Sequence, residues 1–182
     1  MQRTNYLSRS ILFLALAGVS GATLAADADR AVPEPTTFVK KAAVAGLTEV
    51  ETGKLALQKS QDPSIRSFAQ RMVDDHTKAN MELANIAASK GITAPKKPDA
   101  EHQAMIDALA SKSGAAFDRE YSQHMKMDHS KAIALFEGGS RTSDPDLAGF
   151  AKKTLPTLKE HKKLAEKLPG KSAAAAADVP GG

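Results

Sequence analysis

Three histidines of this chain lie on or beside the apolar positions of segments with helical spacing: His76, His129 and His161. His76 and His129 each have a methionine four residues before and an alanine three residues after, and His161 follows Leu158 by three residues. Side chains at such spacings share one helix face, so all three imidazoles are expected to point into a helical core. Converging imidazoles in a bundle core are typical of metal sites.

A fourth candidate ligand is Glu49, in the segment before His76. Positions equally far from a helix turn lie at the same height, because each residue rises ~1.5 Å. Glu49 and His76 are equally far from the turn expected at Asp62-Pro63, and the other two histidines are equally far from Pro145. The sequence therefore predicts one layer that holds three imidazoles and a carboxylate.

This ligand set suits one zinc, copper or mononuclear iron ion. The acids that precede the three histidines point ~100° away around their helices, so they are expected to be outer partners of the ligands or surface charges: Asp75, Asp128 and Glu160. The alternative is that each histidine is a half-buried core residue satisfied by a hydrogen bond, in a protein that holds no metal.

Four long helices are expected to carry these residues. Apolar periodicity predicts helices over 38–60, 63–90, 115–137 and 145–168, and the Asp-Pro pairs at 62–63 and 144–145 are typical helix starts. Short connections make each pair of helices a hairpin. The predicted fold is all-α: an antiparallel up-down-up-down four-helix bundle of ferritin-like shape, with a short extra helix or loop between the second and third helices.

Residues 1–25 are typical of a secretory signal peptide, with Arg3 and Arg9 at the start, an apolar run and a small-residue cleavage site at 23–25. The expected organisation continues with an extended leader over 26–37, the bundle over 38–169 and a disordered Ala/Gly-rich tail over 170–182. The protein is expected to be periplasmic or secreted. No later stretch contains the ~20 apolar residues that a membrane span requires.

Composition excludes several classes of function. The chain has 182 residues, enough for one domain, and no cysteine, which excludes disulfides, thiol chemistry and a lipidated cysteine. Removal of 1–25 takes away two basic residues and no acidic ones, so the net charge falls from +4 to +2, which gives no basis for nucleic-acid binding. No nucleophile motif or phosphate-binding loop is recognisable.

Several motifs together resemble a bacterial family known as domain of unknown function 4142. They are Asp62-Pro63 and the segments 38–43, 49–57, 68–76, 117–121, 128–129 and 154–161, in an order that spans 38–168. The resemblance implies an exported envelope protein with a ferritin-like bundle. Di-iron sites of ferritin-like proteins use Glu-x-x-His on two helices, whereas Val73, Lys126 and Leu158 precede the three histidines by three residues. Ferroxidase activity is therefore not implied.

Three hypotheses follow. The leading one is an exported bundle that binds one metal ion, for metal binding or stress protection in the cell envelope, rather than an enzyme. The second is a metal-free structural or interaction module of the periplasm, whose partner is an envelope protein or a second copy of the chain. The third is a metal-dependent redox enzyme in which Tyr121, near the histidine layer, takes part.

Overall fold

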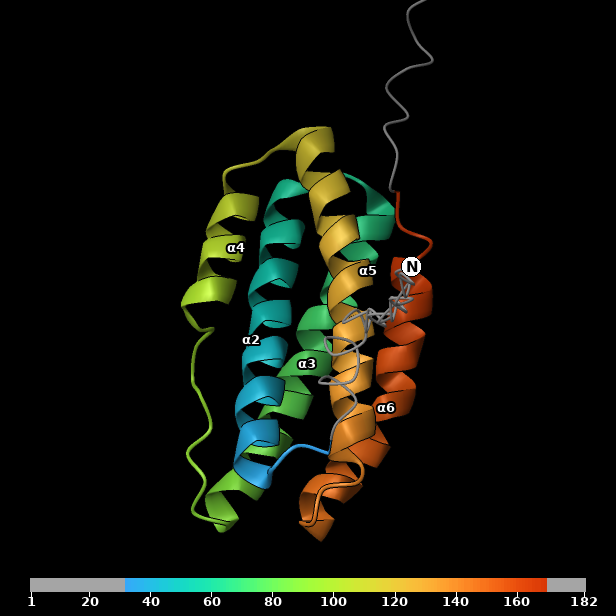
Figure 1. Cartoon of the computed structure of the whole chain (residues 1–182). Helices are drawn as coiled ribbons and strands as arrows, with labels where there is room; N and C mark the ends of the chain where they lie inside the picture. The colour runs from blue at the N-terminus through green and yellow to red at the C-terminus, as the bar shows by residue number, and fades with distance from the viewer. Residues whose placement is uncertain (1–31, 170–182) are drawn as a thin grey trace, which may run out of the picture.

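The computed structural model describes residues 32–169, and these form helices without any strand (Figure 1). The predicted all-helical class is confirmed. The predicted signal peptide (1–25), the first half of the leader (26–31) and the tail (170–182) lie outside the described residues. The five helices are α2 (Pro35–Lys59), α3 (Pro63–Ser89), α4 (Ala100–Ala110), α5 (Gly114–Gly139) and α6 (Pro145–Ala165).

Local sequence signals fix where the helices begin. Asp62 and Asp144 each accept hydrogen bonds from two backbone N–H groups of the following turn, and a proline occupies the first turn of both helices. These caps satisfy donors that have no partner within the helix. Helix α2 begins at Pro35, not at Phe38, so residues 35–37 are helical and not part of an extended leader. The fixed φ of Pro35 suits the first turn of a helix, which accounts for the earlier start.

The four long helices α2, α3, α5 and α6 lie side by side, and α4 packs outside them against α2 and α5 (Figure 1). Of the two predictions for the connection between the second and third long helices, the short helix is confirmed. Asp99 caps α4 by accepting a hydrogen bond from the backbone N–H of His102.

The expected up-down-up-down order is wrong, because α3 and α5 run in the same direction (Figure 1). Met72 and Met125, from the first halves of α3 and α5, belong to one apolar cluster, whereas Leu83 and Phe136, from the second halves, belong to another. The physical reason is α4, which carries the chain back to the end where α3 began (Figure 1). Helices adjacent in space still run in opposite directions.

The core is divided into two apolar clusters. One contains Phe38, Leu83, Phe136 and Leu158, and the other contains residues such as Ile65, Phe68, Met72, Phe117, Tyr121 and Met125. On α3 and α5 the histidines lie between residues of the first cluster and residues of the second. The histidine layer therefore separates the two apolar clusters.

The end of α5 packs tightly against α2, so one methyl group added at Gly139 is expected to lower stability. A Cβ at Gly139 would lie 2.3 Å from Phe38 Cε2, and the Phe38 ring is fully buried with its centroid 5.3 Å from that of Phe136. We expect Gly139→Ala to lower the free energy of unfolding by about 1–3 kcal/mol through overpacking. Gly149→Ala is the control, because nothing lies within 4 Å of its added Cβ.

Urea denaturation measures both variants. Gly149→Ala should stabilise the protein by up to about 1 kcal/mol, since alanine is the better residue in a helix interior. Equal stabilities of the two variants would contradict the close packing of Gly139 on Phe38.

Candidate metal centre

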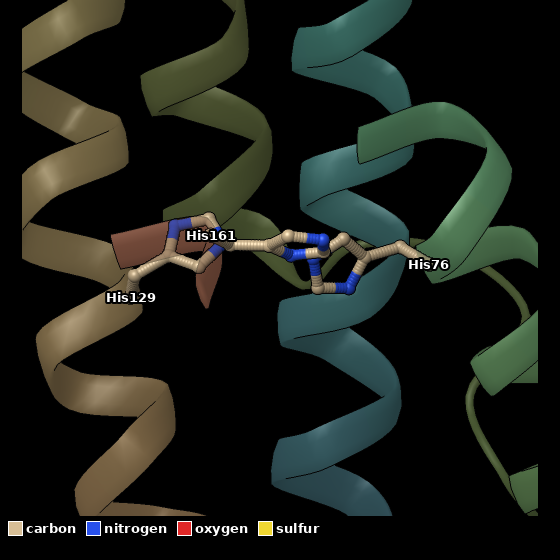
Figure 2. A group of neighbouring side chains, drawn as sticks. All are labelled: His76, His129 and His161. Atoms are coloured by element: carbon tan, nitrogen blue, oxygen red, sulfur yellow. The ribbon is translucent and has the colours of Figure 1, made fainter. Parts of the chain in front are cut away.

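The structure brings the three predicted histidines together in the interior, from three different helices (Figure 2). The ring centroid of His76 lies 5.8 Å from that of His129 and 5.4 Å from that of His161, and the last two are 5.4 Å apart. All three side chains are buried. One ring nitrogen of each histidine lies within 4.8 Å of the corresponding nitrogens of the others, a geometry that could hold a metal ion.

Each ring has a buried nitrogen without a hydrogen-bond partner: Nε2 of His76, Nε2 of His129 and Nδ1 of His161. A buried polar atom left unpaired costs roughly 1–3 kcal/mol. Three such atoms in one small cluster are difficult to explain by packing alone. Ring nitrogens that carry lone pairs and face a shared space are the donors that a transition-metal ion requires, so the residues present fit a metal.

The opposite nitrogens of two rings are held by hydrogen bonds. His129 Nδ1 lies 2.8 Å from the carbonyl oxygen of Met125, and His161 Nε2 lies 3.0 Å from Asp75 Oδ2. Since a carbonyl and a carboxylate only accept, each ring donates its N–H to them and keeps the lone pair on the nitrogen that faces the cluster. Metal-binding histidines are commonly oriented in this way.

The acids that precede the three histidines in the sequence make different contacts. Asp75, predicted as an outer partner of a ligand or a surface charge, contacts His161 on α6 and not the His76 beside it. Arg71 connects the two carboxylates of Asp75 and Glu160, with Nε 3.4 Å from Asp75 Oδ2 and Nη2 2.9 Å from Glu160 Oε2. Sequence reasoning missed Arg71, although its four-residue spacing from Asp75 is a signal for an ion pair on a helix.

Asp128 is half-buried, and no hydrogen bond connects it to a histidine of the cluster. Burial raises its pKa, and the charges of His124, Lys131 and His102 lower it in part. Asp128, predicted as an outer partner of a ligand or a surface charge, is thus a half-buried acid that makes no hydrogen bond to the three rings.

Glu49 is buried at the same level but stands beside the cluster. Its Oε1 lies 3.9 Å from His129 Nδ1, the nitrogen that is bonded to a carbonyl, and its Oε2 has no partner. The group of nitrogens that could hold an ion consists of the three histidines without Glu49. The carboxyl predicted as a fourth ligand therefore approaches the far edge of one ring.

The electrostatics favour neutral imidazoles. Burial lowers the pKa of His76 well below its usual value, and the neighbouring His129 and His161 lower it further. Burial also lowers the pKa of His129 to about 4, and it lowers the pKa of His161 despite the hydrogen bond to Asp75. Neutral rings at pH 7 can bind a cation without first losing a proton.

Tyr121 lies in the apolar cluster next to the histidine layer. Its ring is fully buried, its hydroxyl has no hydrogen-bond partner, and its centroid is 6.3 Å from that of Phe68, which in turn contacts His129. Burial, with the charge of Glu49, raises the pKa of Tyr121 well above its usual value. The phenol is therefore neutral at pH 7.

The described residues thus define an all-helical protein with a buried cluster of three histidines that could hold a metal ion. The chain belongs to the family described as Domain of unknown function (DUF4142), whose model matches residues 20–168. This match confirms the resemblance seen in the motifs.

The chain is also similar to a solved structure, the crystal structure of a DUF305 fragment from Deinococcus radiodurans. The TM-score is 0.65 at 17% sequence identity, over 75% of this chain and 95% of that one. At this identity the likeness concerns the fold alone. The comparison with curated proteins gives no match. Among the helices of residues 32–169, none has the length and apolar character to cross a membrane.

Proposed function

We propose that this protein binds one transition-metal ion through His76, His129 and His161. The observation that carries the proposal is the cluster of three buried histidines: each has an unpaired ring nitrogen, and each has a ring nitrogen within 4.8 Å of those of the other two. Glu49 is buried beside the site, with its Oε1 3.9 Å from His129 Nδ1. Neutral imidazole donors suit zinc, copper or iron.

Three protein ligands leave a coordination position open, as in zinc sites that also bind water or another molecule. The orientation of His129 and His161 by Met125 and Asp75 supports this assignment. It distinguishes a prepared ligand set from histidines that use both nitrogens for internal hydrogen bonds.

The wider setting is also a proposal. The chain is an exported, ferritin-like four-helix bundle in which neighbouring helices are antiparallel, and it serves metal binding or stress protection in the cell envelope. The signal-like features of residues 1–25 and the family membership support this setting.

Thermal denaturation tests the proposal on protein purified without a histidine tag. With free Zn²⁺ or Cu²⁺ at about 100 times its dissociation constant, mass action should add about 2.7 kcal/mol and raise Tm by about 5–10 °C. Mg²⁺ is the control, because it prefers oxygen ligands, and a chelator should reverse the shift. An unchanged Tm with both transition metals would favour the metal-free structural module.

A further inference from the structure

A cavity of about 560 Å³ opens next to the histidine cluster. Glu49, His76 and His129 line it, and all three are buried and carry a polar atom without a partner. His161 is not among the residues that line this cavity. The cavity therefore gives access to the cluster from one side, past two of the three candidate ligands.

Most of the cavity wall is apolar. Leu83, Phe136 and Leu158 are buried residues of the wall, and Ala132 lines it one turn after His129. The exposed part of the lining carries charges of both signs, namely Lys40, Lys41 and Lys131 with Asp99, Glu101 and the half-buried Asp128. Because both signs are present, these outer charges favour neither an anionic nor a cationic ligand. The volume of the cavity falls within the ~300–1,000 Å³ of small-molecule sites.

The charge of a bound metal at the inner end of the cavity, in contrast, favours an anionic ligand. Three neutral imidazoles leave the full charge of a divalent cation in place, and Glu49 provides at most one compensating charge. A net positive charge in a buried apolar site is strongly destabilised unless an anion accompanies it. A ligand that reaches this site is therefore favoured if it carries one negative charge at its inner end and an apolar body along the wall.

We propose that the cavity lined by Glu49, His76 and His129 binds a small organic monocarboxylate, whose carboxylate occupies the open position of the bound metal while its apolar body contacts the wall. This inference rests on the proposed metal binding. It adds a ligand class to that site.

The experiment uses the full-length protein loaded with Co²⁺, whose visible spectrum reports its coordination, and benzoate as the probe. Benzoate should change the Co²⁺ spectrum and bind at least about tenfold more tightly than acetate, because its ring buries apolar area that acetate lacks. Benzyl alcohol has a similar body without the charge and should not change the spectrum at the same concentration.

Ala132→Leu places a larger side chain in the cavity, and Ala134→Leu on the same helix, outside the lining, is the matched control. Ala132→Leu should weaken benzoate binding by more than about tenfold and leave Co²⁺ affinity within about threefold. Ala134→Leu should change neither. If Ala132→Leu does not fold, Ala79→Leu fills the same cavity from α3.

The outcomes separate the two proposals. Failure to bind Co²⁺, together with an unchanged Tm in Zn²⁺ and Cu²⁺, would overturn the proposed function and this inference with it. Normal Co²⁺ binding with no response to millimolar benzoate would overturn the inference alone. Benzoate binding that is undiminished in the folded cavity-filling variant would also overturn it, because the ligand would then bind elsewhere.

Discussion

Substitution of His129 by leucine is expected to reduce Zn²⁺ affinity by more than about 100-fold, beyond the 10–100-fold typical of removing an outer partner of a ligand. The side chain is 1% exposed, and its Nε2 is one of the three buried ring nitrogens of the cluster without a hydrogen-bond partner. Leucine has a similar volume and no polar atom to leave unpaired. The apo-variant should therefore be as stable as the wild type or more so, while the Tm increase with Zn²⁺ disappears.

Competition with a chromophoric chelator measures the affinity. His124→Leu, five residues earlier on α5, is the matched control, since the His124 ring lies 3.4 Å from Glu120 and outside the cluster. This control should bind Zn²⁺ like the wild type. Retention of wild-type affinity in a folded His129→Leu variant would show that the three rings are not the ligands.

Acidification should destabilise the metal-free protein through the same ring. The pKa of His129 is about 4 in the folded protein and 6.5 without burial. Between these values the unfolded chain binds more protons than the folded one, so stability is full above pH 6.5 and is lost as the pH falls to 4. The loss from this group alone is about 3 kcal/mol.

The pKa shifts of the other buried groups also change how stability depends on pH. His76 and His161 also have lowered pKa values and add to the loss in acid. Glu49 has the opposite sign, because burial raises its pKa, so the stability it contributes at low pH is lost as the pH rises. Urea denaturation of the wild type and of His129→Leu at several pH values isolates the contribution of the His129 ring to the pH dependence of stability. Parallel profiles would contradict the lowered pKa of His129.

The helix layout was only partly predictable. Aspartate caps and apolar spacing predicted the long helices well, because both signals act within a few residues along the chain. The direction of α5 was not predictable, since the length of the α3–α5 connection does not reveal that α4 carries the chain back (Figure 1). The histidines are nevertheless level. His76 is the middle residue of α3, and His129 lies two to three residues past the middle of α5, where the packing of the reversed helix still places its ring 5.8 Å from that of His76.

Helical periodicity was enough to predict that three histidines face one interior, since the spacing of apolar residues decides which face of a helix is buried. Three features could be seen only in the folded protein: Asp75 contacts His161, Glu49 lies at the far edge of His129, and a cavity reaches two of the three rings. These features depend on how each helix is rotated against its neighbours and on side-chain rotamers. Both are set by packing between segments far apart in the chain, which helical periodicity does not record.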